Sequence, residues 1–165
     1  MSELPANEGM SLIVQTVTRW LKAFILLFGV YIVIYGHLTP GGGFAGGVIV
    51  ACSFILLTLA YGQRRGLKAV SRGVAGEMDS VGALIFLAVA LAGMIAGGAF
   101  FANFIETGEA ARFTLPSAGL IPLSNIGIGL KVGMSLFLVF TVLSAMHVAV
   151  SGSRRRMISR GEDDR

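Results

Sequence analysis

The residues of this sequence that could take part in chemistry are few and far apart. Nine acidic residues, two histidines and a single cysteine, Cys52, are spread over 165 positions. One cysteine cannot form an intrachain disulfide. His37 and His147 fall at opposite faces of the predicted membrane spans. Each could shuttle protons, because imidazole titrates near neutral pH, or could be a solvated side chain with no special role. These residues do not make a catalytic triad or a metal site, so the sequence predicts a protein that is not an enzyme and needs no cofactor.

Lys131 has the strongest case for a role in ion movement. It interrupts a stretch, 113–153, that is otherwise uncharged, and a charge at the centre of a membrane helix costs about 3 kcal/mol. Ser135 shares its helical face, because the two residues lie four positions apart. Three interpretations stay open: Lys131 extends to the outer lipid headgroups, forms a buried ion pair with another subunit, or takes a direct part in ion or proton movement.

The acidic residues next to the predicted spans have simpler expected roles. Glu77 and Asp79 come just before an uncharged stretch and are expected to cap the start of a helix, where the helix dipole favours negative charge. Glu106 and Glu109 follow that stretch. They are expected in a solvated loop, where they could also attract cations.

The composition indicates which elements must position these residues. Hydrophobic residues make up 55% of the chain and charged residues 13%, whereas a soluble domain carries about 25% charged residues. No formal charge occurs in 23–63 or in 80–105. A membrane-spanning helix needs about 20 residues, so the first stretch is long enough for two spans, and the stretches 80–105 and 113–153 for one each. The sequence therefore predicts an all-α integral membrane protein with four transmembrane helices.

The limits of the spans follow from polar and glycine-rich boundaries. Asp79 or Ser80 is expected to cap the third helix, and Ser124 and Asn125 are capping residue types at the start of the fourth. The expected helices cover 12–35, 43–61, 79–101 and 124–150. The chain is thus divided into a cytoplasmic segment 1–11, a four-helix transmembrane domain 12–150, and a basic, poorly ordered tail 151–165.

Basic residues indicate the orientation of the spans. Of the thirteen Lys and Arg residues, all except Arg112 and Lys131 lie near the start of the first helix, between the second and third, or after the fourth. Since Lys and Arg concentrate in cytoplasmic segments, both chain ends are predicted to be cytoplasmic. This asymmetry explains the net charge of +4 without nucleic acid, although the arginine-rich tail could also bind anionic lipid.

The strongest local motif joins the first two predicted helices. Glycines permit a sharp reversal and a close approach of backbones. The free amides at the start of the following helix could face a polar group or a water-filled path. The motif is therefore either a tight helical hairpin held by its turn residues or part of an ion pathway. Its candidate residues are His37, Pro40, Gly41, Gly42, Gly43 and Phe44.

This motif resembles the signature of the MnhB-domain family, whose members are subunits of the multisubunit Na⁺/H⁺ antiporters of the Mrp or Mnh type. The similarity extends from about Gln15 to Gly133, which leaves out the first residues and the arginine-rich tail. A proline, a glycine triplet and a phenylalanine between two membrane spans are rarely found together. The matching residues of the motif are Gly36, His37, Pro40, Gly41, Gly42, Gly43, Phe44, Gly46 and Gly47.

The resemblance implies a small subunit of a large complex that exchanges Na⁺ or K⁺ for protons across the bacterial inner membrane. Its implied partners are the other membrane subunits, the lipid bilayer and the transported ions. It would help to form or brace the ion pathway and would be required for assembly. Related domains occur in ion-pumping hydrogenases and similar respiratory complexes, so a redox-driven ion pump is one alternative. A membrane scaffold that carries no ion is another.

Glycine spacing points to helix packing. Gly93 and Gly97 lie four positions apart, as do Gly129 and Gly133. Two glycines on one helical face let helix backbones approach closely in lipid. We expect these faces to pack the helices of this chain together and to leave other faces for further membrane subunits.

Overall fold

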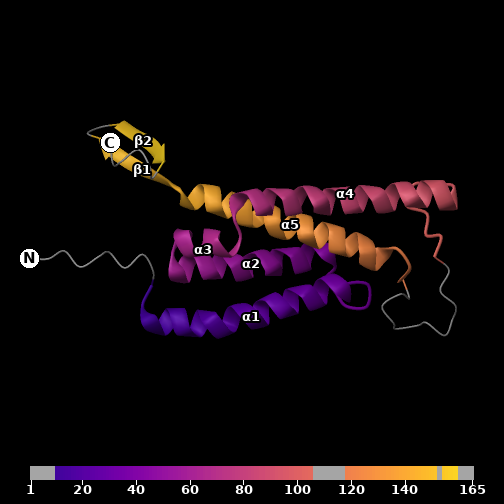
Figure 1. The fold of residues 1–165 in the computed structure, drawn as a ribbon, viewed down its shortest axis with the longest axis horizontal. Coiled ribbons are helices and arrows are strands. Elements are labelled where there is room, and N and C mark those ends of the chain that lie inside the picture. Colours follow the sequence, from indigo (N-terminus) through magenta and orange to yellow (C-terminus); the bar gives the residue numbers. More distant parts are fainter. Residues whose placement is uncertain (1–9, 106–117, 152–153, 160–165) are drawn as a thin grey trace, which may run out of the picture.

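The structure, a computed structural model, describes residues 10–105, 118–151 and 154–159. Four of the helices in these residues are long and apolar enough to cross a membrane, with mean hydropathies from 1.8 to 2.2. The prediction of four apolar helices of membrane-spanning length is therefore confirmed. A fifth, short helix and a two-stranded hairpin were not expected (Figure 1). The elements are α1 (Leu12–Ile34), α2 (Gly43–Tyr61), α3 (Gln63–Ala69), α4 (Arg72–Gly97), α5 (Ile121–Ser144), β1 (Met146–Ser151) and β2 (Arg154–Ser159).

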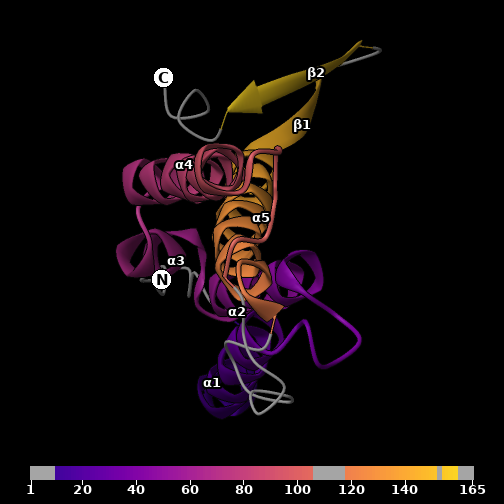
Figure 2. The ribbon, with the colours of Figure 1, turned by 90° about the vertical axis from the view of Figure 1, so that its right-hand side faces the viewer.

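The four long helices form a row rather than a square bundle. α1 packs on α2, α2 on α5, and α5 on α4, so α5 has a neighbour on each side. Figures 1 and 2 show this order from two directions. α4 extends beyond the other helices at the end where α1 and α2 are joined (Figure 1). Because a row leaves two broad faces open, many large apolar side chains of α1 and α4 are exposed on this chain.

The helices of the row meet at pairs of glycines. In each pair, a Cβ added to at least one of the two glycines would lie within about 3 Å of the backbone of the other. Small residues allow such close approach in lipid, where the hydrophobic effect does not hold helices together. The pairs are Gly29 with Gly46 between α1 and α2, Gly47 with Gly129 between α2 and α5, and Gly82 with Gly127 between α4 and α5.

The third long helix begins earlier than expected, whereas α1 and α2 agree with their predicted limits to within one residue. The side chain of Ser71 caps α4, because it accepts a hydrogen bond from the backbone N–H of Val74 at 3.2 Å. The predicted start at 79 is therefore wrong. Glu77, Asp79 and Ser80 lie inside α4 and do not cap it.

The fourth long helix also begins before its predicted start at 124. Pro122 lies in its first turn, a position that suits proline because the missing N–H has no helical partner there. The hydroxyl of Ser124 donates to the carbonyl oxygen of Leu120 at 3.1 Å, and Asn125 bonds to another helix. The expectation that Ser124 and Asn125 cap this helix is therefore wrong.

Two helices end earlier than expected. Gly98, in the left-handed conformation with a φ of 75°, ends α4 four residues before the predicted limit of 101. α5 ends at Ser144 and not at 150, because the residues that follow pair in an antiparallel hairpin, from Met146 opposite Ser159 to Ser151 opposite Arg154. His147 is thus in β1 and not at a helix end. The tail, expected to be poorly ordered, contributes β2.

The start of α1 and the end of α5 lie at the same end of the row (Figure 1). The hydroxyl of Tyr61, at the end of α2, donates to the carbonyl oxygen of Gln15 at 2.7 Å. The side chain of Gln63, in α3, donates to the carbonyl oxygen of Thr141 at 3.1 Å. At this end of the row, one bond therefore joins α2 to α1 and the other joins α3 to α5. The predicted loop residues Glu106, Glu109 and Arg112 lie outside the described residues.

Candidate functional site

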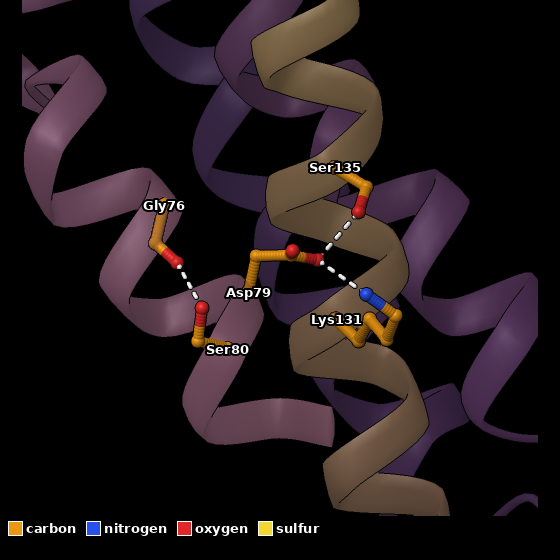
Figure 3. A network of polar contacts seen from close by, with 5 residues as sticks. All are labelled: Gly76, Asp79, Ser80, Lys131 and Ser135. Carbon is orange, nitrogen blue, oxygen red and sulfur yellow. Dashed lines mark hydrogen bonds and ion pairs between the residues drawn. The ribbon is translucent and has the colours of Figure 1, made fainter. Parts of the chain in front are cut away.

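A polar network joins α4 and α5 within their apolar surfaces (Figure 3). The ammonium of Lys131 donates to Oδ1 of Asp79 at 3.0 Å, forming an ion pair. The hydroxyl of Ser135 donates to the same carboxylate oxygen. Asp79 comes from α4 and the other two residues from α5. The network is therefore formed only when the two helices pack.

The close approach of the two helices brings these side chains together. A Cβ on Gly82 would lie 2.7 Å from the carbonyl oxygen of Gly127 and 2.7 Å from the backbone nitrogen of Lys131. Asp79 lies one turn before Gly82, and Ser135 lies one turn after Lys131, so both face the same junction. The glycine pair thus sets the separation that the ion pair needs.

Lys131 lies at the middle of α5. Ten residues of the helix precede it and thirteen follow it, which places it about 15 Å from one end and about 20 Å from the other. Asp79 reaches the same depth from near the start of α4, because α4 is displaced along its axis relative to α5 (Figure 1). The ion pair is therefore formed with an acid of the same chain, which the sequence analysis did not identify as the partner.

The network remains partly open on this chain. The side chain of Lys131 is 47% exposed and that of Asp79 is 25% exposed. Intramembrane charges of this kind almost always face other protein or water rather than lipid. The pair is neutral overall. Its carboxylate could bind a proton or a monovalent cation if the ammonium moved away, which is a chemistry of ion transfer rather than of covalent catalysis.

The hairpin between α1 and α2 is held by its glycines. A Cβ on Gly36 would lie 2.3 Å from the Cα of Gly42, and Gly42 has a φ of 103°, which only glycine adopts without strain. The backbone N–H of Gly43 donates to Oδ1 of Asn125 at 3.2 Å, which attaches the hairpin to α5. His37 and Gly42 are half-buried and Gly43 is buried. The other three candidate residues of the hairpin, Pro40, Gly41 and Phe44, are exposed.

The structure does not combine the hairpin and Lys131 into one site. Gly43 contacts α5 through Asn125 and Ile128, whereas Gly127 and Lys131 contact α4. α2 and α4 lie on opposite sides of α5 (Figure 2). The hairpin braces the start of α5, and the network joins the middle of α5 to α4.

The four glycines expected in helix packing contact this chain itself. Gly129 and Gly133 face the carbonyl oxygens of Gly43 and Gly47 in α2. Gly93 and Gly97 lie against Ala102, in the segment that turns back over the end of α4. These glycine faces are therefore occupied within the chain.

An apolar cavity of about 370 Å³ opens beside the row. Its lining residues include Leu26, Val33, Val50 and Leu130, and also Met78 of α4. Every lining residue is apolar, so this cavity offers no ligand to an ion. It is separate from the candidate site.

Asp79 is the functional candidate whose role sequence reasoning missed. It adjoins the uncharged stretch 80–105, and this position in the sequence predicts that it lies at the helix start. The signal that could have corrected this is Ser71, a favoured capping residue, since a helix begun there carries Asp79 two turns inside. The pairing with Lys131 has no signal in the sequence, because the two residues are 52 positions apart.

Comparison with known families gives one match over most of the chain. Residues 13–152 match a family model described as "Domain related to MnhB subunit of Na+/H+ antiporter". A Staphylococcus aureus protein named "Putative antiporter subunit mnhB2" is 32% identical over 142 residues, which cover 86% of this chain and 95% of that protein.

Two further proteins are similar to this chain over most of its length. An uncharacterised protein of Methanocaldococcus jannaschii is 35% identical over 134 residues, 79% of this chain. This chain spans only 51% of the length of that relative. A chain in the structure of the membrane-bound sulfane sulfur reductase, an archaeal respiratory membrane complex, aligns with a TM-score of 0.66 and 32% identity. The alignment covers 85% of this chain and 60% of the other.

Proposed function

This chain belongs to the family of domains related to the MnhB subunit of Na⁺/H⁺ antiporters, and on that basis we propose that it is a membrane subunit of a multisubunit antiporter that exchanges Na⁺ or K⁺ for protons. Its role is to form or brace part of the ion pathway together with neighbouring subunits, and the complex requires it for assembly. It performs no covalent catalysis. Its location is the bacterial inner membrane, with both chain ends in the cytoplasm.

The observation that carries this proposal is the ion pair of Asp79 with Lys131 between two apolar helices. Ionisable residues at this depth are costly, and in membrane proteins they mark ion or proton pathways. Ser135 adds a hydroxyl to the same carboxylate. A helix pair that carried only a scaffold role would pack as well with apolar residues, because replacing such a pair by apolar residues is often neutral or stabilising.

A single ion pair is too little for a complete transporter. Secondary transporters place several polar groups and interrupted helices near the middle of the membrane. Within the described residues, α4 and α5 supply one such pair. We therefore assign the remaining polar groups of the pathway to other subunits.

The test is to delete the gene for this chain in a host that assembles the complex and to measure cation-dependent proton flux in everted membrane vesicles. The expected result is loss of flux and of the intact complex on a native gel. The wild-type chain restores both. Vesicles that keep full flux without the chain, or sodium-dependent proton flux from the purified chain alone in liposomes, would contradict the proposal.

A second candidate function is the equivalent subunit of a redox-driven ion pump. The alignment with a chain of the membrane-bound sulfane sulfur reductase complex favours it. The two functions place the same subunit beside different neighbours, and the redox centres would lie on other chains. Purification in mild detergent distinguishes them, because co-purified subunits with the visible absorption of iron–sulfur clusters would select the redox complex.

A further inference from the structure

We propose that a helix of a neighbouring membrane subunit covers the face of α4 and α5 around Lys131 and supplies an uncharged oxygen acceptor to its ammonium. The inference rests on the proposed function, because it requires the chain to work within a membrane complex. The contact face is the surface of α4 and α5 around Lys131, and the group that meets it is an uncharged oxygen.

The ammonium of Lys131 has more donors than the described residues of this chain satisfy. A lysine ammonium carries three N–H groups. In the part of the chain that the structure describes, the Lys131 ammonium donates to Oδ1 of Asp79. Its side chain remains 47% exposed. An unsatisfied donor is costly in the hydrocarbon region of a membrane, so the remaining N–H groups of the ammonium need a further polar neighbour.

Lipid headgroups cannot be this neighbour. Lys131 is about 15 Å from the nearer end of α5, and four methylene groups are too short to cover that distance. Reaching outward would also break the ion pair with Asp79. The additional acceptor must therefore lie at mid-helix depth, where other protein or enclosed water supplies it.

The surface beside Asp79 is shaped for a close helix contact. Gly76, Ser80 and Ala83 lie three or four positions apart on α4, and a Cβ on Gly76 would meet nothing within 4 Å. The hydroxyl of Ser80 donates to the carbonyl oxygen of Gly76 at 3.0 Å, so it is satisfied within its own helix (Figure 3). Such small side chains allow a second helix backbone to approach. They favour a packed helix over an enclosed water channel.

The acceptor on the partner should be uncharged. Asp79 and Lys131 already offset each other, and a further carboxylate would leave a net negative charge in a medium of low dielectric constant. An uncharged oxygen can accept a hydrogen bond from the ammonium without adding charge. Suitable groups are a hydroxyl, a carboxamide oxygen or a helix carbonyl freed by a kink.

The contact is tested by photo-cross-linking in native membranes. A photoreactive amino acid replaces Ser80, beside Asp79 on α4, or Val139, which lies eight positions after Lys131 on α5 and is 55% exposed. Both positions are expected to cross-link to the same neighbouring polypeptide. The cross-links should disappear when detergent dissociates the complex, which is the control for proximity.

The acceptor is tested by the stability of the assembly. In Lys131→Met the complex should form in mild detergent but lose the chain roughly tenfold more readily in a stringent one, because one hydrogen bond to a charged group is lost. Lys131→Arg keeps donors and should retain most of the binding. Lys68→Met, at an exposed position of α3, is the matched control and should behave like the wild type.

The possible failures are distinguishable. If the chain co-purifies with other membrane subunits but both probes label only lipid, the inference is wrong and the proposed function stands. If the complex retains Lys131→Met and the wild-type chain equally in stringent detergent, the inference is also wrong and the proposed function stands. If water-soluble maleimide reaches cysteines at both positions in the assembled complex, a water path and not a helix covers this face. If no membrane subunit co-purifies, the proposed function itself fails.

Discussion

At the residue scale, the structure changes the meaning of Lys131. The sequence around it left three interpretations open, and the answer depends on Asp79, which was expected at a helix end. The ion pair at 3.0 Å gives the ammonium an internal partner at the middle of α5. A residue that could have served only to anchor a helix at the membrane surface is thereby paired with an acid at the middle of α5.

We expect Lys131→Ala to leave the complex assembled in mild detergent and to lower cation-dependent proton flux at least tenfold. The reason is that Asp79 then lacks the positive charge that pairs with it. The proposed pathway also loses its cationic group. Flux in everted vesicles, with assembly checked on a native gel, measures the effect. Lys131→Arg is the control for charge. Unchanged transport in Lys131→Ala would restrict the ion pair to a structural role.

At the scale of elements, glycine pairs decide where helices meet. Gly82 and Gly127 set the α4–α5 separation, and Gly47 and Gly129 set that of α2 and α5. In lipid, where helix association relies on close packing, a single added methyl group at these points forces the helices apart. The effect on the site is indirect, because the ion pair needs both helices in contact.

For Gly82→Ala we expect a loss of stability of about 1–3 kcal/mol, as for other overpacked positions, because the new Cβ would lie 2.7 Å from backbone atoms of α5. Thermal unfolding in detergent measures it. Gly76→Ala is the matched control on the same helix, since its Cβ would meet nothing within 4 Å, and it should unfold like the wild type. Similar melting of the two variants would show that the α4–α5 contact tolerates wider spacing.

The hairpin gives a prediction at the same scale. Gly42 has φ 103° and ψ −172°, a conformation open essentially to glycine alone, so Gly42→Ala should cost about 1–3 kcal/mol. Pro40→Ala, at an exposed position of the same hairpin, should cost less. Both are compared by thermal unfolding of the purified chain. Equal losses would mean that the hairpin depends on proline stiffness more than on glycine conformation.

At the scale of the whole molecule, the row of helices explains why this chain is suited to a complex. Each helix in a row has open faces, and the main contact of α4 with the rest of this chain is with α5. Large apolar side chains such as Trp20, Phe24 and Ile95 are 66–84% exposed. Lipid can cover these side chains, but it cannot satisfy the ammonium of Lys131.

The orientation of the row in the membrane is testable. With four spans and the basic segments at one end, both chain ends are expected in the cytoplasm. In a Cys52→Ser background, single cysteines at Met10 and Arg165 should resist a membrane-impermeant maleimide in intact cells and react in everted vesicles. Labelling of one end in intact cells and the other in everted vesicles would mean an odd number of spans.

The number and nature of the long helices were determined by the sequence alone. Uncharged stretches of sufficient length must be helical in lipid, because every backbone polar group has to be satisfied within its own segment. The turn at Pro40 and the following glycines also divided the first stretch correctly, since glycine and proline act locally. The number of spans and the position of this turn depend on residues that are adjacent in the sequence, so the sequence alone can predict them.

The tertiary structure alone decided the site. Asp79 and Lys131 are 52 positions apart, and their meeting depends on the axial displacement of α4 against α5 and on the contact of Gly82 with Gly127. Those quantities arise from packing between helices, which hydropathy along a single chain does not encode. The same holds for the ends of α4 and α5, where Ser71, Gly98 and the β1–β2 pairing outweighed the capping residues chosen from the sequence.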